Sequence, residues 1–278
     1  MQKLSDLTWQ EDRSTVAVAG ICFDGQSSFM PGAAGAPDRI REAFYSSSTN
    51  QCCENGLDLA AVDWFFDAGN RRPDPGGEWL VQIEGFASEL ISRGKRTIFL
   101  GGDHSISYPL VRAHADRYPD LTILHLDAHA DIYDSFAGSR YSNACPFARI
   151  MEENLAQKLI QAGIRTLTPH QREQAARWDV EIYEMKGRRG FKPPQSAAPL
   201  YLSLDLDVLD PAFAPGVSHP EPGGYTTREV LDIIQTIEAP IIGADIVEYN
   251  PLKDPTGITA LVAVKLLKEI AAKMIETE

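Results

Sequence analysis

Three ionisable side chains with alternate spacing follow one apolar stretch of this sequence. The segment 125–131 is His-Leu-Asp-Ala-His-Ala-Asp, so that Asp127, His129 and Asp131 lie two residues apart. It follows the apolar run 121–124, which is typical of a buried strand. In an extended segment alternate side chains lie on the same face, so these three can meet at one point. Because burying unpaired ionisable groups is costly, we interpret them as ligands of a metal ion.

Two further apolar stretches end in the same kinds of residue. The run 200–204 precedes Asp205 and Asp207, and the run 97–100 precedes His104 by a few residues. An oxygen-rich set of Asp and His without Cys suits Mn²⁺, and also Co²⁺ or Ni²⁺, better than a structural zinc site. Because three strand ends contribute, we expect a centre with more than one ion. Its candidate ligands are His104, Asp127, His129, Asp131, Asp205 and Asp207.

The charges of these six residues allow two divalent ions. Four carboxylates balance the four positive charges of two such ions, while neutral histidines add nothing, so the centre would be close to neutral. A water molecule bound to the ions can become hydroxide at about pH 7. A neutral centre does not repel a cationic substrate.

The segments that must position these residues alternate between strand-like and helical patterns along the chain. Apolar runs predict strands within 15–23, 96–100, 121–127, 157–167, 199–207 and 241–248. Helical periodicity and capping residues predict helices at 37–44, 78–92, 108–117, 169–178, 226–237 and 259–275. Such alternation predicts an α/β fold with three α/β/α layers and a mostly parallel sheet. Ligands of these sheets bind at the carboxyl ends of the strands, where all the Asp and His clusters are expected.

Composition indicates a soluble globular protein. The length of 278 residues suits one domain, 1–278, and the hydrophobic content of 44% is ordinary. The net charge of −13 argues against nucleic acid and anionic membranes as partners, and it is compatible with a small cationic substrate. No run of about 18 apolar residues occurs, and the first ten residues lack an apolar signal segment, so we expect a cytoplasmic protein.

The chain resembles the ureohydrolase family of arginases, agmatinases and related guanidino-group hydrolases. The matching motifs occur in the family's order and span nearly the whole chain: 23–32, 101–105, 127–131, 203–211 and 243–251. The amino-acid sequences of segments 218–224 and 247–251 are more similar to those of bacterial agmatinases than to those of arginases.

The resemblance implies a metal centre of the manganese type and an arginase-like fold, usually assembled as a homo-trimer or homo-hexamer. Asp127 and Asp205 would bridge the two ions. One ion would be bound by His104, Asp127, Asp131 and Asp205, and the other by His129, Asp127, Asp205 and Asp207.

The resemblance also implies hydrolysis of a guanidino compound to urea and an amine. Asp131 would orient the bridging hydroxide and pass its proton on, and Glu248 would bind the guanidinium by charge-assisted hydrogen bonds. Agmatine, which gives putrescine, is the favoured substrate. Guanidinobutyrate, guanidine and formiminoglutamate are alternatives, and a fold-related amide deacetylase with a single zinc is a weaker one.

One position departs from the family pattern. The family carries a histidine in a Tyr-Ser-His context after the second motif, whereas residues 141–143 are Tyr-Ser-Asn. Asn143 cannot titrate, although its amide can donate and accept hydrogen bonds. Three interpretations follow. The chain is an active hydrolase in which Asp131 or water protonates the leaving amine, or it is a weakened variant, or it is an enzyme that acts on a different substrate. A non-catalytic metal-binding homologue is the rival from another class.

The remaining candidate residues are four histidines and one acid. His125 shares a strand face with the ligands, and we expect it to orient one of them. His219 and Glu221 lie in a Pro/Gly-rich loop after the third strand end and are candidates for the pocket wall. His114 and His170 are expected at the surface.

Overall fold

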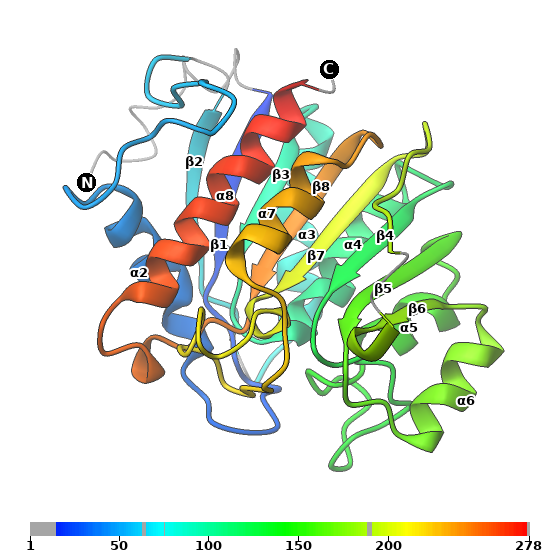
Figure 1. Ribbon diagram of the computed structural model, residues 1–278. Helices are drawn as coiled ribbons and strands as arrows, with labels where there is room; N and C mark the ends of the chain where they lie inside the picture. The colour runs from blue at the N-terminus through cyan, green and yellow to red at the C-terminus, as the bar shows by residue number, and fades with distance from the viewer. Residues whose placement is uncertain (1–14, 63–64, 75, 188–190, 277–278) are drawn as a thin grey trace.

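Eight parallel strands form the central sheet of the computed structural model, which describes residues 15–62, 65–74, 76–187 and 191–276 (Figure 1). The strand order is β2-β1-β3-β8-β7-β4-β5-β6. The bounds are β1 Val16–Ile21, β2 Phe65–Arg71, β3 Arg96–Leu100, β4 Thr122–Leu126, β5 Lys158–Ile164, β6 Glu181–Glu184, β7 Leu200–Asp205 and β8 Ile241–Val247.

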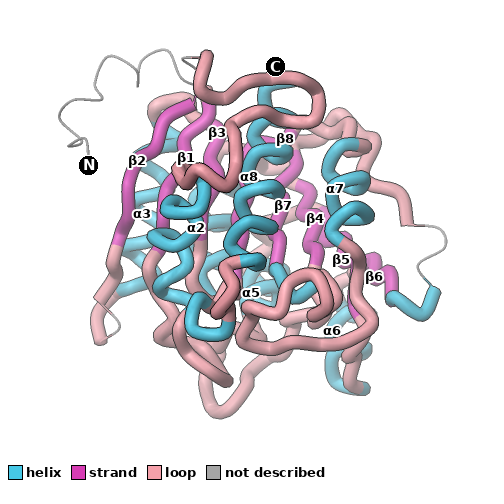
Figure 2. The backbone as a smooth tube through the Cα atoms, turned by 60° about the vertical axis from the view of Figure 1, so that its left-hand side comes forward, coloured by secondary structure: helices cyan, strands magenta, loops and turns pink. Residues whose placement is uncertain are grey.

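Helices cover both faces of this sheet, which confirms the predicted α/β/α fold. One face carries α2 (Ala36–Phe44), α7 (Thr227–Gln235) and α8 (Ile258–Glu276), which Figure 2 shows in front of the strands. The other face carries α3 (Trp79–Ser92), α4 (Ser107–Ala115) and α5 (Pro146–Glu152). The helix α6 (Pro169–Arg177) lies at the β6 end of the sheet (Figure 1).

Successive side chains along each strand point to opposite faces of the sheet, so a separate apolar core forms on each face. In β3, Ile98 and Leu100 are buried beneath α2 and α8, whereas Phe99 is buried on the face of α3 and α4. The same period places Leu202 and Tyr201 of β7 in opposite cores. Strands buried on both faces have nearly continuous apolar sequences, which is the pattern that the sequence showed.

The two edge strands were not predicted. β2 has the sequence Phe-Phe-Asp-Ala-Gly-Asn-Arg and β6 has Glu-Ile-Tyr-Glu, and neither is a continuous apolar run. Short 3₁₀ turns follow two central strands, η3 (His104–Ile106) after β3 and η5 (Leu206–Val208) after β7. Within the described residues, no helix is long and apolar enough to cross a membrane, and the first ten residues lie outside them.

The prediction that His114 lies at the surface is wrong. Its ring is fully buried between α4 and the sheet, with Nδ1 2.7 Å from the Leu110 carbonyl oxygen and Nε2 3.0 Å from Thr97 Oγ1. Burial lowers the pKa of His114 to about 4. The helical pattern alone could not show that this face of α4 packs on the strands, whereas His170, at the start of α6, is exposed as predicted.

Candidate metal centre and substrate pocket

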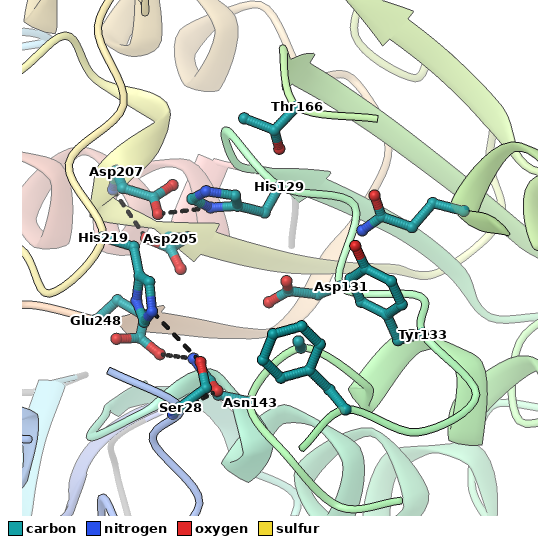
Figure 3. A pocket seen from close by; sticks show the side chains of 13 residues that line it. Ser28, His129, Asp131, Tyr133, Asn143, Thr166, Asp205, Asp207, His219 and Glu248 are labelled. Carbon is teal, nitrogen blue, oxygen red and sulfur yellow. Dashed lines mark hydrogen bonds and ion pairs between the residues drawn. The ribbon is translucent and has the colours of Figure 1, made fainter. Parts of the chain in front are cut away.

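The six predicted ligands meet at one edge of the sheet because β3, β8, β7 and β4 are neighbours. His104 follows β3, the residues from Asp127 to Asp131 follow β4, and Asp205 and Asp207 lie at the end of β7. Figure 3 shows four of these six side chains: His129, Asp131, Asp205 and Asp207. All strands run in the same direction, so their carboxyl ends open on the same side. The tertiary structure therefore brings together every ligand that the strand-end pattern predicted.

The first cluster surrounds one nitrogen of His104. Its Nδ1 lies 3.2 Å from Asp127 Oδ2, 3.1 Å from Asp131 Oδ2 and 3.2 Å from Asp205 Oδ2. His104 is fully buried, and Nδ1 makes no well-directed hydrogen bond. One imidazole N–H cannot be directed at three oxygens at once, so the arrangement favours a positive charge shared among these groups.

The second cluster uses the other oxygen of the same aspartate. His129 Nδ1 lies 2.9 Å from Asp207 Oδ2 and 3.4 Å from Asp127 Oδ1. Asp127 thus faces His104 with one oxygen and His129 with the other. The two clusters are adjacent and share one carboxylate, as a dinuclear centre requires.

The geometry of the first cluster fits a divalent ion. Two atoms bound at right angles to an ion at about 2.1 Å lie about 3 Å apart, which is close to the separations around His104 Nδ1. In the described part of the chain, no Lys or Arg forms an ion pair with the four clustered aspartates. Salt bridges to Lys or Arg therefore do not explain the clusters, and the Asp and His donors suit Mn²⁺, Co²⁺ or Ni²⁺.

Electrostatics of the cluster favour added positive charge. Burial raises the pKa of Asp205 well above its ordinary value, and the nearby Asp207 and Asp127 carboxylates raise it further. Burial and Asp127 raise the pKa of Asp207 to about 6. Burial alone would lower the pKa of His104, but its three carboxylate neighbours together raise it well above the ordinary value. A proton at this position takes the place that a metal cation would occupy.

His125 orients the shared aspartate, as predicted from its place on the strand. Its Nε2 lies 2.7 Å from Asp127 Oδ2, and Gln161 Nε2 donates to its Nδ1 at 2.9 Å. Both ring nitrogens are thereby occupied. His125 acts on Asp127 and leaves no nitrogen free for an ion.

Two site residues adopt left-handed backbone conformations. Asp131 has φ 45° and Glu248 has φ 61°, which are uncommon values for residues other than glycine. Such strain persists where the surrounding structure fixes it and is concentrated at functional sites. A close approach also fixes the turn before His104, because a Cβ on Gly102 would lie 1.5 Å from the Phe23 carbonyl oxygen.

Glu248 and Asn143 form a hydrogen-bonded pair beside the candidate metal ligands. Glu248 Oε1 accepts hydrogen bonds from the His104 backbone N–H at 2.9 Å and from Asn143 Nδ2 at 3.2 Å, whereas the buried Oε2 has no partner among the described residues. Asn143 Oδ1 accepts from the Ser28 backbone N–H at 3.0 Å. Burial and the charge of Asp103 raise the pKa of Glu248 to about 8. One oxygen of Glu248 is therefore saturated, and the other is open to a bound molecule. A cation bound there would lower the pKa of Glu248 again and favour its ionised, accepting form.

A cavity of about 220 Å³ opens above these residues, and Figure 3 shows the side chains that line it. Its wall includes His219 but not Glu221, so only one of these two candidates lies at the pocket. His219 Nε2 lies 3.3 Å from Ser28 Oγ. Within the described part of the chain, none of the lining residues is Lys or Arg. Sequence reasoning missed the outer wall, which has no strand-end pattern: Tyr133, Phe136, Thr166 and Gln171.

Comparisons with known proteins agree with this architecture. A model of the arginase family matches residues 14–272. Arginase 1, mitochondrial, of Arabidopsis thaliana is 43% identical over 94% of this chain and 82% of its own length. Agmatinase of Bacillus anthracis is 34% identical over 93% of this chain and 91% of its own.

A solved structure shows the same fold. The arginase from Medicago truncatula superposes with a TM-score of 0.90 and 40% identity, covering 97% of this chain and 93% of that one. Identity is thus higher to these arginases than to the Bacillus agmatinase, so the expected likeness to agmatinases does not decide the substrate. The extent of the matches is decisive for the family, and the chain belongs to the arginase family.

Proposed function

We propose that this protein is a dinuclear metal hydrolase that cleaves a guanidino compound to urea and an amine. The observation that carries the proposal is the pair of carboxylate–imidazole clusters joined by Asp127, with the free Oε2 of Glu248 beside them. A metal centre alone would not indicate the substrate. The unpartnered carboxylate oxygen indicates a ligand that carries N–H donors.

We assign two divalent ions, Mn²⁺ first and Co²⁺ or Ni²⁺ as alternatives, to the clusters. When bound, the ions supply a water molecule that is activated for nucleophilic attack at about neutral pH. The proposed ligands are His104, Asp127, Asp131 and Asp205 for one ion, and His129, Asp127, Asp205 and Asp207 for the other.

The protein's own residues bind and orient the substrate. Glu248 Oε2 accepts an N–H of the guanidinium, and Asn143 holds the same carboxylate through Oε1. Asp131 faces His104 with Oδ2, and we assign its Oδ1 to hold the proton that the attacking water loses. That proton passes to the leaving nitrogen as the C–N bond breaks. Water thus contributes oxygen to urea. Its second proton leaves that oxygen as the C=O bond of urea forms and passes to the departing amine, so that a guanidinium and one water give neutral urea and an ammonium.

Agmatine is our first choice of substrate. The distal end of agmatine is an ammonium, whereas arginine ends in a carboxylate and an ammonium. Among the residues that the structure describes, no Lys or Arg lines the cavity to pair with a carboxylate, and the chain carries a net charge of −13. The second candidate is arginine, which is favoured by the higher identity to relatives named arginase.

A substrate panel tests this choice. Purified protein loaded with Mn²⁺ is assayed for urea with agmatine, arginine, guanidinobutyrate and guanidine, and for formamide with formiminoglutamate. We expect the highest kcat/KM with agmatine. A higher kcat/KM with arginine would assign an arginase, and no product from any compound would favour the non-catalytic homologue.

The domain organisation, assembly and cellular location are also proposed. We propose a single ureohydrolase domain over 1–278 that assembles as a homo-trimer or homo-hexamer in the cytoplasm, with neither nucleic acid nor membrane as a partner. Light scattering after size-exclusion chromatography tests the assembly. A monomer of 30.6 kDa would contradict it.

A further inference from the structure

Asp245 is a fully buried carboxylate in the middle of β8 that the proposed reaction does not use. Its Oδ1 accepts a hydrogen bond from Ser203 Oγ at 2.7 Å, and its Oδ2 accepts one from the Tyr201 hydroxyl at 2.9 Å. In the part of the chain that the structure describes, it forms no ion pair with Lys, Arg or His. Burying a carboxylate among neutral partners is costly, so its place in an apolar strand needs an explanation.

The strand register connects Asp245 to the metal centre. Ser203 on β7 is paired with Asp245 on β8, and its hydroxyl lies 3.0 Å from Nε2 of His104 at the end of β3. His104 is the ligand whose other nitrogen, Nδ1, faces three aspartate oxygens. The buried order is therefore Asp245, Ser203, His104 and then the first cluster.

The direction of these hydrogen bonds is determined by the chemistry of the groups. Ser203 donates its single hydroxyl proton to Asp245 Oδ1. The Ser203 oxygen must then accept from His104 Nε2–H. A histidine that binds a metal ion is neutral and carries one N–H, which leaves the lone pair on Nδ1.

We propose that Asp245 is a positioning residue for the metal centre. It acts through Ser203 to hold the His104 ring with Nε2 protonated and the Nδ1 lone pair directed at the first cluster. This inference rests on the proposed metal centre but not on any substrate. It also predicts unequal effects on the two ions, because His129 of the second cluster faces Asp207 and Asp127 instead.

The test compares variants on both sides of the carboxylate. Asp245→Asn and Ser203→Ala interrupt the connection to His104, whereas Tyr201→Phe removes the other donor to Asp245 and leaves that connection in place. Metal-free protein is titrated with Mn²⁺ by calorimetry and with Co²⁺ by visible absorption, and circular dichroism checks the fold of each variant. We expect one of two binding steps to weaken by about 10- to 100-fold in Asp245→Asn and Ser203→Ala. The other step should stay unchanged, as should both steps in Tyr201→Phe.

Three results would overturn the inference: unchanged binding in the first two variants, equal weakening of both steps, or an equal loss in Tyr201→Phe. If Asp245→Asn fails to fold, Ser203→Ala decides alone, since it removes only one oxygen atom. Because the readout is ion binding, an enzyme that binds two ions normally but releases no urea would refute the proposed function only. Conversely, urea release with unaltered ion binding in the variants would refute only the role of Asp245.

Discussion

Replacing Glu248 by Gln should weaken substrate binding without weakening the fold. Oε1 of Glu248 accepts hydrogen bonds from the His104 backbone N–H and from Asn143, while no described residue is a partner of Oε2. In the variant the amide oxygen should stay where two donors already point. The new NH₂ group must then occupy the Oε2 position, where it faces the guanidinium with a donor instead of an acceptor.

The expected loss follows from the hydrogen bond that disappears. A hydrogen bond to a charged group contributes about 1.5–3 kcal/mol, which corresponds to about a 10- to 150-fold decrease in kcat/KM. The NH₂ group of the glutamine would also face the N–H donors of the guanidinium, and this repulsion adds to the decrease in kcat/KM. Because Glu248 is buried and pairs with no Lys or Arg in the part of the chain that the structure describes, the neutral amide should leave Tm equal or higher.

The assay is urea release under kcat/KM conditions, together with thermal unfolding of the metal-loaded protein. Glu221→Gln is the matched control, because it removes the same charge from a loop residue that does not line the cavity. A Glu248→Gln enzyme with kcat/KM equal to that of the control would refute the assignment of Glu248 as the guanidinium acceptor. A large fall in Tm would show instead that Glu248 has a structural role.

Three further predictions concern the missing histidine, pH and metal removal. Because we assign proton transfer to Asp131, Asn143→His should leave kcat nearly unchanged, whereas a rise approaching the 10²–10⁴-fold typical of general acid–base catalysis would show that the missing histidine limits turnover. Buried His114, with its pKa lowered to about 4, stays neutral in the folded state while the unfolded chain takes up a proton below about pH 6.5, so stability falls as pH decreases. Chemical denaturation measures this: between pH 7 and pH 4 the free energy of unfolding should fall by about 3 kcal/mol more in the wild type than in His114→Gln. An equal fall in both proteins would contradict the prediction. Chelation should lower Tm and added Mn²⁺ should restore it, because ions that bind only the folded state stabilise it, and a Tm insensitive to metal would argue against the centre.

The sequence predicted the parts of the site that follow local rules. Asp127, His129 and Asp131 have alternate spacing directly after a strand, and Asp205 and Asp207 repeat the pattern on β7. Parallel strands open their carboxyl ends on one side, so convergence followed from the predicted fold. The edge strands β2 and β6 escaped prediction because their sequences lack a continuous apolar run.

Other features depend on which strands become neighbours. The connection from Asp245 to Ser203 requires the β7–β8 register, and Gln161 reaches His125 only because β5 pairs with β4. One signal was present in the sequence: a charged residue inside the apolar run 241–247 is costly unless it has a purpose. The left-handed backbone at Glu248 has no comparable signal in residue type.

The central claim is that two ions at the joined clusters hydrolyse a guanidinium group. The most direct measurement is the rate of urea release from agmatine and arginine as metal-free protein receives increasing equivalents of Mn²⁺, with bound metal determined on the same samples. We predict no urea without metal and full activity when two ions are bound per chain, with one amine formed per urea. Two bound ions without urea from either compound, or urea release that persists in fully chelated protein, would contradict it.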